Sequence, residues 1–250
     1  MLLAAVTLVA CLSAVTLTSR SQAFTLTASL TPDVLGAPTN LSTSMTLSEG
    51  ADLRNPISHV VAYGPAGLQL DPRGLATCER TQLEAEGPLG CPAESRVGFG
   101  GGVGAVELGN TVVKEPYTLD FFLAPSEHGH LRILIYADAS HPISVDLVMT
   151  AREVVGPRPY GFGLAVEVPP ISAIPGAANA WVESSYFSLG ASNVAYYRTV
   201  HGDRKLVHVE GLIAPARCPS GGFPFETILT FEDHTTSTGR YVSPCPRTHR

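Results

Sequence analysis

Charged side chains are scarce in this sequence. They make up 15% of its 250 residues, and the formal net charge is −6 at neutral pH. Only two lysines occur, Lys114 and Lys205, and the arginines are scattered. Because binding to nucleic acid or anionic lipid needs a clustered basic face, we expect neither kind of partner. No long apolar run occurs after the first twenty residues, so we expect no transmembrane span in the mature chain.

The composition fits neither a disordered chain nor a helical bundle. Hydrophobic residues make up 44% of the sequence, which is enough to form a core. The 24 glycines and 20 prolines follow no period, and both residue types disfavour the interior of a helix. The composition therefore predicts a turn-rich globular protein built mainly of β-strands.

The N-terminal segment has the pattern of an export signal. Met1 to Leu17 carry no charge, and Ser21-Gln22-Ala23 places small residues where signal peptidase prefers them. We therefore predict a signal peptide over residues 1–23 and a single mature domain over residues 24–250, secreted or held at the cell envelope. The run that ends at Cys11 also resembles a lipobox, and lipidation of Cys11 is the less favoured alternative.

The mature chain contains an even number of cysteines, namely Cys78, Cys91, Cys218 and Cys245. In an exported protein an even number predicts disulfides, and four cysteines allow three pairings. We favour the two sequential pairs, because each of them brackets one local excursion of the chain. Neither pair has the C-x-x-C spacing of a redox or zinc motif, so we expect structural cystines.

Short alternating segments separated by turn residues run through the mature chain. Together they predict an all-β fold, an antiparallel β-sandwich of the immunoglobulin-like or jelly-roll-like type. The expected strands are residues 24–30, 41–47, 57–63, 96–106, 117–123, 131–137, 143–150, 161–168, 181–189, 194–200, 205–213, 225–231 and 235–242.

One short helix and two hairpins complete the predicted elements. Glu79 to Glu86 favours a helix that ends at Gly87-Pro88, between the first two cysteines of the mature chain. Hairpin turns are expected at Pro125 to His130 and at His201 to Arg204.

Several motifs around cysteine and proline link the chain to a family. They are Asp71-Pro72-Arg73-Gly74, Cys91-Pro92-Ala93-Glu94, Cys218-Pro219-Ser220-Gly221 and Pro244-Cys245-Pro246. Through them the mature chain resembles a family of exported all-β proteins from high-GC Gram-positive bacteria. The resemblance implies export, cystines and a β fold. It implies no activity, because no function is established for that family.

No catalytic or cofactor motif is present in its proper context. Gly100 to Ala105 fits the pattern G-x-G-x-x-A, but a strand follows where dinucleotide binding needs a helix N-terminus, so we interpret it as a bent, glycine-rich strand. No G-x-S-x-G nucleophile motif occurs. His128-Gly129-His130 could bind a metal with Glu127 or His141, but a solvated turn is the simpler interpretation. We expect no enzyme and no cofactor.

The best indication of binding comes from aromatic and histidine side chains. We predict a possible binding surface that includes Trp181, Tyr186, His128 and His130, because an exposed platform of rings suits sugars or protein hot spots. The leading hypothesis is a secreted or envelope-associated binding or structural protein, with a protein or glycan partner held by surface loops. A lectin-like module and a metal-dependent or other extracellular hydrolase are the alternatives.

Overall fold

The computed structural model describes residues 24–47, 54–140, 144–172, 179–190 and 195–246. The predicted signal peptide and Cys11 lie outside these residues. The elements, in chain order, are β1 (Phe24–Thr31), β2 (Pro38–Leu47), β3 (Ile57–Pro65), β4 (Gln69–Asp71), α1 (Arg80–Glu86), the 3₁₀ turns η1 (Gly87–Gly90) and η2 (Ala93–Ser95), β5 (Arg96–Leu108), β6 (Thr111–Glu127), β7 (His130–Ala139), β8 (Val145–Val155), β9 (Tyr160–Glu167), β10 (Trp181–Leu189), β11 (Ala195–Val200), β12 (Asp203–His208), β13 (Gly211–Ile213), β14 (Phe223–Phe231) and β15 (Thr236–Ser243).

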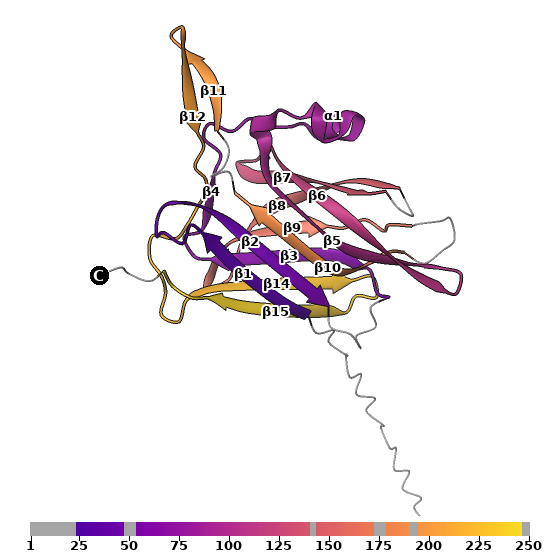
Figure 1. Ribbon diagram of the computed structural model, residues 1–250. Coiled ribbons are helices and arrows are strands. Elements are labelled where there is room, and N and C mark those ends of the chain that lie inside the picture. Colours follow the sequence, from indigo (N-terminus) through magenta and orange to yellow (C-terminus); the bar gives the residue numbers. More distant parts are fainter. Residues whose placement is uncertain (1–23, 48–53, 141–143, 173–178, 191–194, 247–250) are drawn as a thin grey trace, which may run out of the picture.

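Thirteen strands form one antiparallel sheet, in the order β15-β14-β3-β9-β8-β7-β6-β5-β10-β2-β13-β4, with β1 paired to β2. The sheet folds over on itself, so that β1 lies beside β15 (Figure 1). An all-β antiparallel fold with one short helix is therefore confirmed. A sandwich has two separate sheets, whereas these thirteen strands form one continuous sheet that folds over its own inner face.

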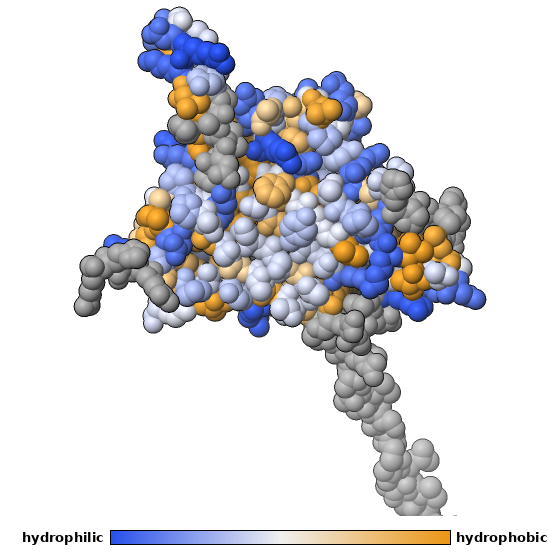
Figure 2. All heavy atoms as spheres, in the orientation of Figure 1, coloured by the Kyte–Doolittle hydropathy of each residue, from blue (hydrophilic) through white to orange (hydrophobic). Residues whose placement is uncertain are grey.

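The period-two pattern of the sequence decides which face of each strand points inward. Along β1, Leu26, Ala28 and Leu30 are buried, whereas the intervening Thr25 and Thr27 are exposed. Because successive side chains of a strand point to opposite faces, apolar alternation puts one face in the core and leaves the other in solvent. Figure 2 shows the result on the outer face over β1 and β2, which is mostly pale to blue.

The β6–β7 and β11–β12 hairpins have tighter turns than the sequence suggested. β6 and β7 continue to Glu127 and His130, so the predicted six-residue loop is a two-residue turn. His128 and Gly129 both have positive φ, at 53° and 82°, as a type I′ turn requires. A register shift between Ala124 and Glu127 keeps the two strands paired. β11 and β12 form a separate two-stranded sheet that projects from the body (Figure 1).

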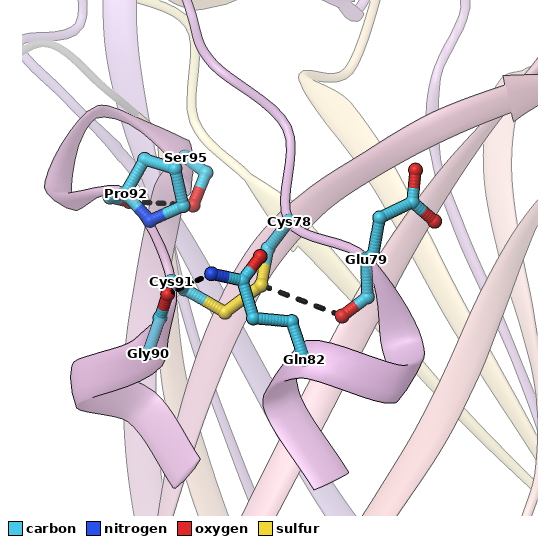
Figure 3. The surroundings of a disulfide bond; sticks show 7 residues. All are labelled: Cys78, Glu79, Gln82, Gly90, Cys91, Pro92 and Ser95. Carbon is cyan, nitrogen blue, oxygen red and sulfur yellow. Dashed lines mark hydrogen bonds between the residues drawn. A yellow bond between two sulfur atoms is a disulfide. The ribbon is translucent and has the colours of Figure 1, made fainter. Parts of the chain in front are cut away.

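Both predicted disulfides are present, Cys78–Cys91 and Cys218–Cys245. The first one joins the two ends of the segment that contains α1, as Figure 3 shows. The Gln82 side chain donates a hydrogen bond to the carbonyl oxygen of Gly90 within the same segment. The predicted helix is therefore correct and lies in a covalently closed insert.

The α1 insert covers the outer face of the sheet. Leu83, the one fully buried residue of the helix, packs in a cluster with side chains from β6, β7 and β8, namely Phe122, Ala124, Leu134 and Val148. This cluster lies on the opposite side of these strands from the main core, because the core uses the alternate positions, such as Phe121 and Ile135. The strands β6 to β8 are thus apolar on both faces.

No helix in the described part of the chain is long and apolar enough to cross a lipid bilayer.

Candidate functional site: an interior cavity

The inner face of the folded sheet is filled at one end and hollow at the other. Along β7 the inward residues change from Ile133 and Ile135, which are buried in the core, to Ala137 and Ala139, which line a cavity. Gly104 on β5 lines it as well. Because these residues are too small to meet across the interior, a partly open cavity of about 270 Å³ remains on the inner face of the sheet.

The wall of this cavity is almost entirely apolar. Leu147, Met149, Leu164 and Val166 point inward from β8 and β9, line the cavity and are only partly buried. Apolar surface left in contact with water is unfavourable by roughly 25 cal/mol per Å². A ligand that covered this surface would therefore gain binding energy from the hydrophobic effect.

A few polar side chains interrupt the apolar wall. The described ones are Thr43, Glu115, Tyr117, Ser185 and Thr227. Three of these, from β6 and β10, lie on either side of β5, where Gly104 pairs with Glu115, and Gly102 pairs with both Tyr117 and Ser185. Gly102 and Gly104 have no side chains to separate them, so the polar groups of the two flanking strands face a common space.

The side chain of Tyr117, on β6, extends across β5 and is held in place by a hydrogen bond. Its hydroxyl donates to the backbone carbonyl of Ser184 on β10, with a distance of 3.1 Å between the oxygens. Burial is the main cause that raises the pKa of Tyr117 to about 12. The phenol is therefore neutral at physiological pH and acts as a fixed part of the wall.

Trp181 is the only tryptophan of the chain, and it lies at the start of β10 opposite Ala105. It lines the cavity and is 4% exposed. Its indole nitrogen has no hydrogen-bond partner among the residues that the structure describes. A buried N–H without an acceptor is costly.

The aromatic residues of the predicted binding surface differ in exposure. Trp181 is 4% exposed, whereas Tyr186, on the same strand, is 54% exposed. The structure thus gives no joint platform of Trp181 and Tyr186 for stacking on a sugar.

The predicted histidines lie elsewhere, at the β6–β7 turn. His128 and His130 are exposed and border a polar hollow of about 230 Å³, together with Glu127, Arg132, Arg152 and Glu153. Within residues 24–47, 54–140, 144–172, 179–190 and 195–246, no group of three His, Cys, Asp or Glu side chains is placed to hold a metal ion. His141 lies outside the described residues.

Glu115 is the residue of this site that the sequence analysis missed. It is 7% exposed and lines the cavity from the first half of β6, which was expected to begin only at residue 117. The sequence does hold a clue to this position. Glu115 lies an even number of residues before Leu119, Phe121 and Leu123, so its side chain points to the same inner face of the strand. A carboxyl group at an inward position of an apolar face indicates a special role.

Comparisons of the chain with models of protein families, with curated proteins and with solved structures returned no significant match.

Proposed function

We propose that this is an exported binding protein that holds a small apolar molecule inside its folded sheet. The observation that carries the proposal is the cavity of about 270 Å³ with an almost wholly apolar wall. Ligand pockets are mostly apolar, with a few polar groups that fix orientation, and this wall has that composition. A smaller apolar cavity, of roughly 150 Å³, is sufficient to bind benzene in another protein.

Two features support export and action by binding. The disulfides Cys78–Cys91 and Cys218–Cys245 are of a kind that persists in oxidising compartments outside the cytosol. The polar groups on the cavity wall are few and belong to a rigid sheet, which suits holding a ligand. We therefore favour a carrier or sequestering protein over the lectin-like and hydrolase alternatives.

The test is binding of a neutral apolar dye, N-phenyl-1-naphthylamine, to the purified mature chain. We expect a saturable rise in dye emission with one site per chain, together with quenching of Trp181 by energy transfer, because Trp181 lines the same cavity. The Ala137→Phe variant, which fills the cavity from β7, should weaken binding at least about tenfold, which corresponds to about 1.4 kcal/mol.

The matched control is Ala165→Phe on β9. Ala165 lies between Leu164 and Val166, which line the cavity, so its own side chain points to the outer face. This variant should bind the dye as the wild type does. Dye binding that does not saturate, or that Ala137→Phe leaves unchanged while the variant is folded, would refute the proposal.

A further inference from the structure

The hairpin of β11 and β12 stands apart from the main sheet and projects from the body of the molecule (Figure 1). Among the described strands these two pair only with each other, in a register that puts Tyr197 directly opposite Leu206. The two side chains are 58% and 48% exposed. Because a two-stranded hairpin is marginally stable in water on its own, an exposed apolar pair on such a ribbon favours contact with a further surface.

The same face of the hairpin carries a basic group. The guanidinium of Arg204 lies over the Tyr197 ring, 4.2 Å from its centre, so Arg204 shares a face with the Tyr197–Leu206 pair. Lys205 follows Arg204 in the strand and therefore points to the opposite face. Within the described residues Arg204 forms no ion pair. We call Tyr197, Arg204 and Leu206 the hairpin face, and its tyrosine and arginine are types enriched at protein interfaces.

A row of side chains across the main sheet has the opposite charge. It crosses five adjacent strands and lies on the outer face, because its members on β6 and β7 share the parity of Phe122 and Leu134 in the outer cluster. From β10 to β8 this outer row consists of Tyr186, Gly101, Thr118, Asp138 and Asp146.

One end of the outer row is aromatic. A Cβ atom built on Gly101 would lie 3.2 Å from the hydroxyl oxygen of Tyr186, so the Tyr186 ring extends over β5 along the row. Phe99 lies two residues before Gly101 on β5, and 55% of it is exposed on the same face. Two large aromatic side chains are therefore open to a partner at this end.

The other end of the outer row is acidic. Asp138 and Asp146 lie directly opposite each other, and neither has a basic partner among the residues that the structure describes. Like charges directly opposite each other in a sheet are unfavourable. A cation that reached this end of the row would therefore relieve the repulsion.

The two surfaces match in length and in the order of their groups. The outer row is about 19 Å long at about 4.8 Å per strand, and the six-residue strands of the hairpin are about 20 Å long at roughly 3.3 Å per residue. Along the hairpin, Tyr197 lies nearer the base and Arg204 nearer the turn. A hairpin laid along the row with its turn toward β8 places aromatic against aromatic and base against acid.

On this basis we infer that two copies of this chain associate, with the hairpin face of one docked along the outer row of the other. Arg204 then lies at Asp138 and Asp146, while the Tyr197–Leu206 pair covers the aromatic end. Because the hairpin face and the outer row are different surfaces, every copy presents both halves of the contact. The contact uses the outer face, so it does not depend on the ligand proposed for the cavity.

The charge distribution of the chain favours this partner. Residues 195–208 contain three of the 16 lysines and arginines and only one acid, in a chain whose net charge is −6. One ribbon covers less than the roughly 800 Å² per partner of a standard interface, so we expect weak association that salt weakens further.

Sedimentation velocity of the mature chain over a range of concentrations tests the inference. We expect self-association at about 0.1 M salt that weakens severalfold at about 1 M, where the Debye length falls from about 10 to about 3 Å. Arg204→Asp and Asp146→Arg should each weaken association at least about tenfold, because each places like charges together. A chain with both substitutions exchanges the charges and should associate within about threefold of the wild type.

The matched control is Lys205→Asp, which makes the same change in charge on the opposite face of the ribbon and should leave association nearly intact. A wild-type chain that stays monomeric at every concentration would overturn the inference. So would association that Asp146→Arg leaves unchanged, since the hairpin would then dock elsewhere, or a double variant that does not recover. Thermal unfolding shows that each variant is folded, and unchanged dye binding shows that the cavity is a separate site.

Discussion

At the scale of single residues, the absence of a side chain at Gly102 shapes the cavity wall. The Tyr117 ring extends from β6 across this glycine and reaches the Ser184 carbonyl on β10. A Cβ atom at residue 102 would overlap both that carbonyl oxygen and the Tyr117 hydroxyl. The close approach of three strands at this point therefore depends on a residue without a side chain.

This geometry predicts opposite outcomes for two substitutions on one strand. Gly102→Ala should destabilise the protein by about 1–3 kcal/mol, the usual cost of forcing an atom into a packed site. Gly104→Ala should be neutral or slightly stabilising, because its Cβ has space and alanine restricts the unfolded chain more than glycine does. Urea unfolding of both variants is the measurement, and equal stability of the two would contradict the explanation.

Another local feature is a pair of acids on the outer face of the sheet. Asp138 on β7 lies directly opposite Asp146 on β8. Partial burial, then the charge of Asp146, raises the pKa of Asp138 above its ordinary value. The Tyr136 hydroxyl donates a hydrogen bond to Asp146 at 2.7 Å and also faces this pair.

Since the pKa of Asp138 is raised on folding, the native state binds its proton more tightly than the unfolded state does. Stability should therefore fall as pH rises from the ordinary aspartate pKa through the raised native value. At neutral pH, Asp138→Asn should stabilise the protein by about 0.5 kcal/mol, because like charges directly opposite each other are unfavourable. Thermal unfolding at several pH values tests this. The gain should disappear in an Asp146→Asn background, and its persistence there would exclude the repulsion as its cause.

At the scale of elements, the helical insert is attached through very few side chains. α1 has seven residues and buries only Leu83, in the outer cluster with Phe122 and Leu134. So short a helix has little stability of its own. Its position therefore depends on that contact, on the Cys78–Cys91 bond and on the hydrogen bonds that Arg80 donates to Thr150 and to the carbonyl oxygen of Val148 on β8.

Leu83→Ala should accordingly destabilise the protein by about 2–5 kcal/mol, the range for a leucine truncated in a core. Dye binding in the cavity should be unchanged, because the outer cluster and the cavity use opposite faces of β6 to β8. Chemical denaturation and dye titration of the same variant separate the two effects. A large loss of dye affinity in folded protein would show that the two faces are coupled.

The elements themselves were largely predictable from the sequence, because they depend on local patterns. The strand predicted over Trp181 to Leu189 is β10 with both ends correct, and the composition of residues 79–86 predicted the helix. The glycine-rich segment from Gly100 is part of β5, as expected. β4 (Gln69–Asp71) was missed, because three residues are too few to show a period.

The cavity was not predictable, because it depends on what faces each inner position across the fold. Ala137 and Leu147 have the same inward pattern whether the opposite side chain is 4 Å away or separated by a cavity. Trp181 was assigned to a possible exposed platform, but it is only 4% exposed in the fold. A single sequence carries no information on these distances.

At the scale of the whole molecule, two covalent links hold separate regions of the sheet. Cys218–Cys245 joins the segment before β14 to the segment after β15, with 27 residues of separation, and Cys78–Cys91 spans 13. In the chain-entropy model these loops stabilise the fold by about 3.5 and about 3 kcal/mol respectively.

Reduction should therefore lower the free energy of unfolding substantially, and replacing only Cys218 and Cys245 by serine should account for about half of the loss. Urea unfolding with and without reductant measures the loss in the free energy of unfolding when both disulfides are broken. The double serine variant measures how much of that loss is due to Cys218–Cys245. Identical unfolding midpoints in the two conditions would mean that neither bond constrains the unfolded chain.

The position of the α1 insert also makes this molecule convenient to use as a sensor. Leu89, in η1, exposes 98% of its surface and belongs to the insert on the side of β6 to β8 that faces away from the cavity. Because lysine is so rare in this chain, Leu89→Lys would add an amine at a known place for coupling to a chip or a fluorophore. The immobilised protein would keep its binding chamber unobstructed, with Trp181 as a built-in optical reporter of occupancy.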